Sequence, residues 1–150
     1  MKQTFNSSGN PSLPHREGGG GLCYILLISL FTLVACTESF SDRCRREARE
    51  FTERQCPRLV DQFMILDSMT YADEPQGFTY HYRLTGELDN PLKLSPQVLT
   101  QFTEQMQQGL RQDISLRRYK ERSLTFTYRY RSERTDSLLF EASFGPEEYK

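Results

Sequence analysis

The sequence has no tryptophan, two histidines and four cysteines among its 150 residues. So few imidazole and thiolate ligands leave little from which to build a zinc site or another transition-metal centre. The patterns His-Glu-x-x-His and Cys-x-x-Cys are absent, as is the strand-turn-helix motif that presents a nucleophilic serine. These absences predict a protein that is not an enzyme and that holds no metal and no cofactor.

An excess of charge of either sign is also missing. The chain has 19 basic and 20 acidic side chains, so its formal net charge is −1 at pH 7. A chain with this balance has no general positive field of the kind that attracts nucleic acid. Its hydrophobic fraction of 37% is too low for a multi-pass membrane protein and high enough for one small core.

The sequence lacks an apolar run long enough to cross a bilayer as a helix. The longest uncharged apolar block, Leu22 to Ala35, has 14 residues, whereas a spanning helix needs about 20. Its length fits the hydrophobic region of a signal peptide. A core helix at the edge of a domain would show polar residues with a period of 3.6, forming one polar face, and this block has no such face. The stretch before it is long and weakly basic for a signal peptide, so a start codon downstream of Met1 stays open.

The apolar block ends in Leu33-Val34-Ala35-Cys36. These four residues resemble the lipobox of bacterial prolipoproteins. The resemblance implies that Cys36 receives a diacylglyceryl group on its thiol, that the preceding peptide is removed, and that acyl chains such as palmitate anchor the protein. Thr37 stands where an inner-membrane retention signal has Asp, which favours the outer membrane. We therefore expect residues 1–35 to be a lipoprotein signal peptide and 36–150 to be one domain with a short tether.

The mature part alternates helical and strand patterns. Ser41 or Asp42 is expected to cap a helix to about Gln55, and Ser95 a second helix with Pro96 at its first position. Apolar residues at every second position predict four strands, at 64–71, 78–85, 124–131 and 138–144. The expected fold is α+β, with two layers in the order helix, hairpin, helix, hairpin. We predict a four-stranded antiparallel sheet with both helices on one face.

That helix face of the sheet is aromatic. It carries four tyrosines, for which core packing is the expected role: Tyr80, Tyr82, Tyr128 and Tyr130. The segment Gln55-Cys56-Pro57, followed by the strand patterns, loosely resembles small uncharacterised envelope lipoproteins. Since those relatives have no assigned activity, the resemblance implies no catalytic residue.

The two cysteines of the domain, Cys44 and Cys56, lie 12 residues apart. On one straight helix they would be about 18 Å apart, beyond the reach of a disulfide. We expect Cys44 to pack on the apolar stripe of the first helix and Cys56 to be a buried cap residue. A bridge within or between chains stays open.

Basic residues are concentrated between Arg111 and Arg134, where eight stand against three acidic ones. The strand pattern places four side chains on the solvent face as a candidate anion-binding face: His81, Arg83, Arg129 and Arg131. A solvated basic edge that discourages strand pairing is the simpler interpretation. An anionic lipid head group, an acidic glycan or an acidic envelope protein is the alternative partner. Export disfavours nucleic acid.

The sequence as a whole predicts a lipid-anchored protein of the bacterial cell envelope. Its domain is expected to be a non-catalytic binding or structural module, with the membrane as partner through Cys36. Two alternatives stay open. One is an envelope hydrolase or redox accessory that uses Cys56 or His81, and the other is a cytosolic anion-binding module.

Overall fold

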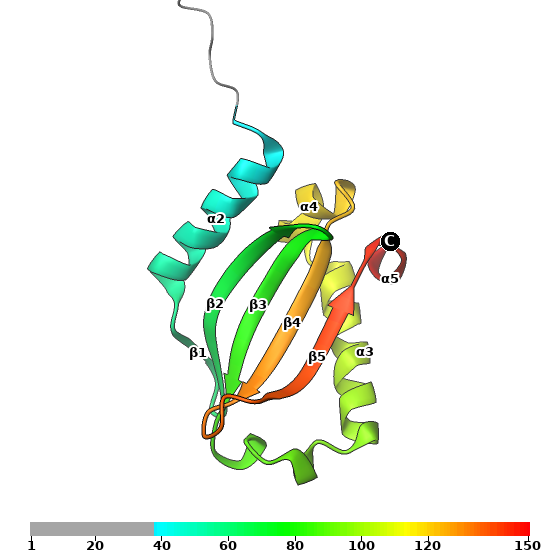
Figure 1. Ribbon diagram of the computed structural model, residues 1–150. Helices are drawn as coiled ribbons and strands as arrows, with labels where there is room; N and C mark the ends of the chain where they lie inside the picture. Colours follow the sequence, from blue (N-terminus) through cyan, green and yellow to red (C-terminus); the bar gives the residue numbers. More distant parts are fainter. Residues whose placement is uncertain (1–37) are drawn as a thin grey trace, which may run out of the picture. The chain divides into compact units, whose positions relative to one another are not determined.

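The computed structural model describes residues 38–150, which form one compact unit (Figure 1). The predicted signal peptide and Cys36 lie outside the described residues. The helices and strands follow in the order α2 (Phe40–Gln55), β1 (Arg58–Asp61), β2 (Met64–Asp73), β3 (Gln76–Leu84), α3 (Pro96–Gln112), α4 (Arg117–Glu121), β4 (Thr125–Ser132), β5 (Leu138–Phe144) and α5 (Pro146–Tyr149). Short 3-10 turns η2 (Gly86–Leu88), η3 (Pro91–Lys93) and η4 (Ile114–Leu116) lie before and after α3.

The strands form a five-stranded mixed sheet in the order β1-β2-β3-β4-β5. The α+β class is confirmed, but the four-stranded antiparallel sheet is wrong, because β3 pairs with β4 in parallel. The cause is α3, whose 17 residues extend about 25 Å and bring the chain back to the end of the sheet where β3 began. A helical crossover of this kind makes the next strand parallel.

Strand β1 was not predicted from the sequence. Its four residues are all exposed, so no alternation of apolar and polar side chains marks it. It forms the edge of the sheet and pairs antiparallel with β2. Leu59 and Val60 of this strand are large apolar side chains that remain 66% and 50% exposed.

The helix ends depart slightly from the expected positions. Ser39, rather than Ser41 or Asp42, caps α2, because its hydroxyl accepts a hydrogen bond from the Asp42 N–H at 3.1 Å. Ser95 caps α3 as predicted, through the Val98 N–H. Helix α3 ends at Gln112.

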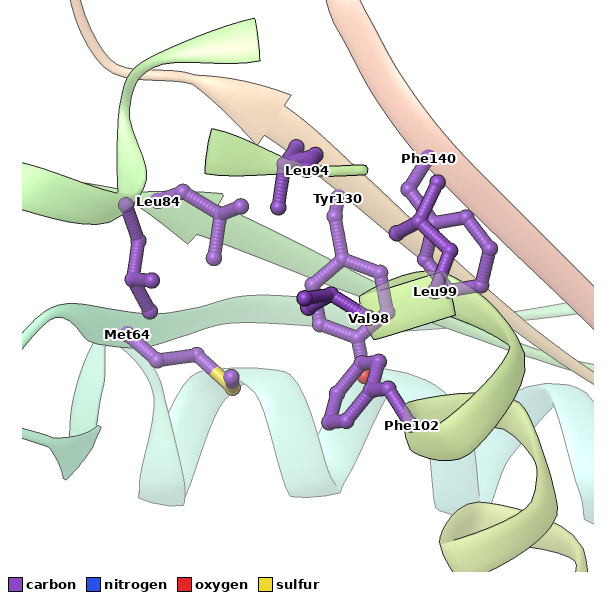
Figure 2. A pocket seen from close by; sticks show the side chains of 9 residues that line it. Met64, Leu84, Leu94, Val98, Leu99, Phe102, Tyr130 and Phe140 are labelled. Atoms are coloured by element: carbon purple, nitrogen blue, oxygen red, sulfur yellow. The ribbon is translucent and has the colours of Figure 1, made fainter. Parts of the chain in front are cut away.

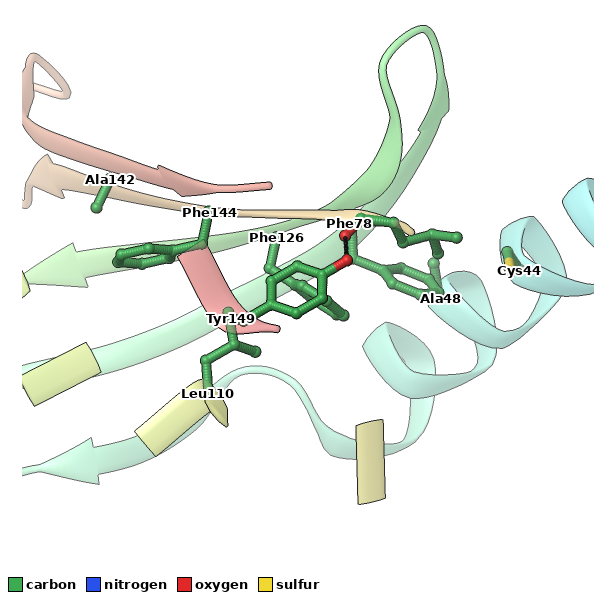
Figure 3. Close-up of a cluster of buried hydrophobic side chains, with 9 residues drawn as sticks. Cys44, Ala48, Phe78, Leu110, Phe126, Ala142, Phe144 and Tyr149 are labelled. Atoms are coloured by element: carbon green, nitrogen blue, oxygen red, sulfur yellow. Dashed lines mark hydrogen bonds between the residues drawn. The ribbon is translucent and has the colours of Figure 1, made fainter. Parts of the chain in front are cut away.

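The core lies between the aromatic face of the sheet and the helices (Figure 3). Phe78, Leu124 and Phe126 are fully buried, together with Cys44 of α2. The C-terminal residues form α5. Tyr149 is buried, and its hydroxyl donates to the Leu124 carbonyl at 2.6 Å.

Candidate binding groove

A groove crosses the helix-covered face of the sheet. Helix α2 packs over β2, and α3 packs over β4 and β5, through Phe102 on Tyr130 and Phe140. Three adjoining cavities of about 120, 300 and 460 Å³ lie on this face; residues of α3 line the first two, and Phe51 of α2 lines the third. The first and second share Met64, Phe102 and Tyr130, while the second and third share four residues: Tyr82, Asp113, Leu116 and Tyr128. We call this continuous channel the tyrosine groove.

The floor of the tyrosine groove is a ladder of stacked rings. Because β3 and β4 are parallel and in register, Tyr80 lies beside Tyr128 and Tyr82 beside Tyr130. The ring centroids of these pairs are 5.2 and 4.9 Å apart, with interplanar angles of 14° and 16°. Phe140 stacks on the other side of Tyr130 at 5.7 Å. Since neighbouring rings occupy the faces, the rings present their edges and hydroxyls to the groove.

Three of the four hydroxyls in this ladder are free for a ligand. The Tyr130 hydroxyl donates to the Met106 sulfur at 3.7 Å. Those of Tyr80, Tyr82 and Tyr128 make no hydrogen bond to another residue of the described chain, and none is fully buried. Burial raises the pKa of all four phenols, which keeps them protonated and able to donate.

One end of the groove is wholly apolar and less open than the rest (Figure 2). The cavity of about 120 Å³ at this end is lined by aliphatic and aromatic side chains alone: Met64, Leu84, Leu88, Leu94, Val98, Leu99, Phe102, Tyr130 and Phe140. A cavity without polar partners does not hold ordered water well. This end therefore suits hydrocarbon.

The other end is open and carries the charged side chains of the groove. Arg58 of β1 and Asp113, which follows α3, both line the cavity of about 460 Å³. The Arg58 guanidinium lies 6.0 Å from the Phe51 ring and donates to Gln55 at 3.3 Å. No described carboxylate forms an ion pair with it. The Asp113 carboxylate accepts hydrogen bonds from the Ser115 N–H and hydroxyl.

Sequence reasoning identified these tyrosines but assigned them to the core. A signal for the groove was present, because each strand changes from phenylalanine to tyrosine along the same face. Phe78 and Phe126 are buried, whereas the tyrosines that follow at positions 80, 82 and 128 are only partly covered. Residues with a polar tip are typical of positions where one end of the side chain is wet.

The structure does bring together the predicted anion-binding residues on the opposite face. His81 lies beside Arg129, and Arg83 beside Arg131, across the parallel pair of strands. Burial and the two neighbouring arginines of β4 lower the pKa of His81, and its ring nitrogen Nε2 lies 2.9 Å from the Thr70 hydroxyl. At neutral pH the imidazole is therefore uncharged.

Each arginine of that face already has an acidic partner. Arg83 binds both oxygens of Asp67, at 3.1 and 2.8 Å. Arg129 pairs with Glu141, and Arg131 lies 3.1 Å from Asp136. The cationic charge of this face is thus compensated, and anion binding there stays a prediction.

The basic segment is compensated in part. Arg117 pairs with Glu121 at 2.8 Å, Arg118 with Glu47 at 2.7 Å, and Arg134 with buried Asp89 at 3.1 Å. The Lys120 ammonium donates to the carbonyls of Leu110 and Arg111 at the end of α3.

The other cations of the segment also contact the domain. Arg111 donates to the Glu148 carbonyl, and Arg122 lies over the Phe40 ring. The local charge excess is therefore held largely in contacts within the domain.

Cys56 and His81, the candidates for a catalytic role, are not brought together. His81 lies on the face of the sheet that the helices leave uncovered, whereas Cys56 caps α2 on the helix side. Cys56 is half-buried rather than buried as predicted, Cys44 is buried as predicted, and both thiols are free. Burial raises the pKa of both, which reduces the reactive thiolate.

Residues 38–150 contain no group of three or more side chains placed to hold a metal ion. None of their helices is long and apolar enough to cross a membrane.

Comparison with known proteins places this fold in a family. The family described as "Domain of unknown function (DUF8479)" matches residues 39–140, so the chain belongs to it. Its fold is similar to the crystal structure of a Pseudomonas aeruginosa protein described as a "putative secreted protein", with a TM-score of 0.61 and 14% sequence identity. That likeness covers 73% of this chain and 92% of the other. No curated protein matches significantly.

Proposed function

We propose that this member of the DUF8479 family is an exported, lipid-anchored envelope protein whose domain is a non-catalytic binding module. The observation that supports binding is the tyrosine groove, an apolar channel with three unused phenol donors on its floor. Apolar concave sites with a few polar groups are the usual form of ligand pockets.

The proposed location rests on the N-terminal sequence. Leu33-Val34-Ala35-Cys36 would direct acylation of Cys36, and several acyl chains together anchor a protein stably. Thr37 after the cysteine favours the outer membrane. The structural relative described as a secreted protein agrees with a position outside the cytoplasm.

A non-catalytic role agrees with the chemistry of the described residues. Catalysis by Cys56 would need a nearby base and a lowered thiol pKa, but His81 lies on the other face and burial raises the pKa of Cys56. The tyrosine groove holds phenols of raised pKa, which donate hydrogen bonds but do not act as bases near neutral pH.

The anchor is tested by the intact mass of the N-terminal peptide from fractionated cells. We expect the envelope fraction to contain a chain that begins at acylated Cys36, and the variant Cys36→Ala to lose both the added mass and the membrane association. An unmodified soluble wild-type chain would contradict the proposed location.

The groove is tested with 1-anilinonaphthalene-8-sulfonate, a dye whose fluorescence increases when it binds an apolar surface, and with a variant that fills the channel. Gly109 of α3 lines the cavity of about 300 Å³, and a Cβ built there meets no heavy atom within 4 Å. Gly109→Phe should therefore occupy the groove without disturbing the fold and abolish the fluorescence increase of the dye.

Gly109→Ala is the matched control, since it adds one methyl group and should keep dye binding. Circular dichroism checks that both variants fold. Equal dye binding by wild type and a folded Gly109→Phe variant would show that the tyrosine groove is not the binding surface.

A further inference from the structure

We infer that the tyrosine groove binds a free fatty acid, with the aliphatic tail in the apolar end and the carboxylate at Arg58. This inference rests on the proposed binding function and names the ligand class. It follows from the gradient of polarity along the channel, from its shape, and from the charge left unpaired at its mouth.

The polarity of the channel changes in one direction. At the apolar end the lining side chains are aliphatic or aromatic, apart from the thioether of Met64, and the Tyr130 hydroxyl there already donates to Met106. In the middle the ring edges of Tyr82 and Tyr128 add free hydroxyls. At the open end the lining includes Arg58, Asp113 and Ser115. A ligand that matches this order is apolar over most of its length and polar at one end.

The shape of the channel favours a chain over a sugar. Sugars bind aromatic platforms through ring faces, but neighbouring rings cover the faces of Tyr82 and Tyr130 here. What remains exposed is a row of ring edges with apolar walls on either side. Val60 of β1 and Val98 of α3 line those walls and are 50% and 49% exposed, so a bound chain would remove apolar surface from water.

Arg58 is the residue that would bind the polar end of the ligand. Other cations near the groove are engaged, since Arg118 pairs with Glu47 and Lys120 with helix carbonyls. Arg58 has only the amide of Gln55 as a hydrogen-bond partner in the described chain. It is therefore free to bind a carboxylate with two parallel hydrogen bonds.

One carboxylate of the protein opposes this ligand. Asp113 lines the middle and the open end of the channel. Its oxygen Oδ1 accepts two hydrogen bonds from Ser115, which offset part of its charge. Removing that charge should strengthen the binding of a fatty acid, so Asp113→Asn gives a change of opposite sign to that of Arg58→Gln.

The length of the groove sets the length of the tail. Leu84 at the apolar end and Tyr80 at the open end are four residues apart on β3, which is about 13 Å at the rise of an extended strand. An extended aliphatic chain advances about 1.25 Å per methylene, the projection of a 1.5 Å carbon bond. The groove therefore accepts at least about ten carbons.

The experiment measures displacement of a dansyl-labelled fatty acid from the full chain carrying Cys36→Ser, which cannot be acylated. Saturated fatty acids from about six to sixteen carbons are the competitors. We expect affinity to rise up to about fourfold per methylene and to level off beyond about ten to twelve carbons. An affinity that does not depend on chain length would overturn the inference.

Variants at the open end test the head group, with laurate and methyl laurate as probes. Arg58→Gln should weaken laurate binding about tenfold and leave methyl laurate unchanged, while Asp113→Asn strengthens laurate alone. Arg54→Gln is the matched control, because Arg54 is an exposed arginine of α2 that lines none of the three cavities. Equal loss of both probes, or no loss of laurate, would contradict a carboxylate at Arg58.

The results separate this inference from the proposed function. If Gly109→Phe abolishes dye binding but no fatty acid competes, the groove is a binding surface for another apolar ligand and the inference is wrong. If Gly109→Phe changes neither dye nor fatty-acid binding, both are wrong. Competition by phosphatidylglycerol vesicles without competition by free laurate would assign the groove to membrane lipid instead, and would also overturn the inference.

Discussion

Replacing Gly77 with alanine tests the parallel pairing of β3 with β4, on which the tyrosine groove depends. Gly77 lies directly beside Thr125, where the two strands begin to pair. A Cβ at position 77 would lie 2.9 Å from the carbonyl carbon of Thr125 and closer still to its oxygen. Both groups that would have to move belong to the backbone of paired strands, so no side-chain rotation relieves the clash.

The cost follows from that rigidity. Overpacking a well-packed site costs about 1–3 kcal/mol, and a clash with backbone in a paired strand belongs at the upper end. We expect Gly77→Ala to lower the free energy of unfolding by about 3 kcal/mol, which outweighs the roughly 0.5–1 kcal/mol that alanine normally gains over glycine in a strand. For a domain of this size the melting temperature should fall by about 10 °C.

Urea denaturation followed by circular dichroism measures this loss, with Gly109→Ala as the control of identical chemistry. Gly109 lies inside α3 with open space around its missing Cβ. Alanine there should raise the free energy of unfolding by about 0.5–1 kcal/mol. A Gly77→Ala variant as stable as wild type would show that β3 and β4 do not approach as closely as described. The register that pairs the tyrosines of these strands would then be wrong as well.

Three further measurements test other parts of the domain. Tyr149→Phe leaves the Leu124 carbonyl without its donor. It should therefore lower the free energy of unfolding, measured by urea denaturation, by about 1–3 kcal/mol. No change would mean that α5 frays. Hydrogen bonds from Ser132 and Arg134 lower the pKa of Asp89, so its contribution is present above the pKa of an unfolded aspartate and is lost as pH falls through the lower folded value. Asp89→Asn should therefore flatten the loss of stability in acid, and an unchanged acid profile would contradict this. Cys56, which is partly exposed, should react with a thiol reagent in the folded protein while buried Cys44 reacts only on unfolding, and equal rates followed by mass spectrometry would contradict the burial of Cys44.

The positions of the main elements could be predicted because local signals mark them. Serine caps fix the start of α3, and the alternation of Phe78, Tyr80 and Tyr82 marks one face of β3. The direction of β4 could not be predicted, since a period of two is the same for parallel and antiparallel strands. The short elements β1 and α5 were missed because four residues are too few to show a period.

The candidate site was harder to predict than the fold, for a reason of the same kind. Alternation identifies which tyrosines share a face, but not how far apart the helices that cover this face lie. That separation depends on where α2 and α3 pack, over β2 and over β4 with β5. The compensation of the predicted cationic face was missed because alternation does not show pairing across strands, and the partners of Arg83 and Arg129 are Asp67 of β2 and Glu141 of β5.

The parallel pairing and the tyrosine groove are consequences of one another. In register, the parallel strands place tyrosine beside tyrosine at two positions of the same face, so that each ring stacks on a neighbouring ring. Tyr130 is also covered by Phe102 of α3 and is buried, whereas the other three rings remain partly uncovered. A helix above these three rings would leave their hydroxyls without water or partners, at a cost of about 1–3 kcal/mol for each buried unsatisfied group. The free hydroxyls therefore favour an open groove, and the phenylalanines that precede them, Phe78 and Phe126, are the buried positions of the same face.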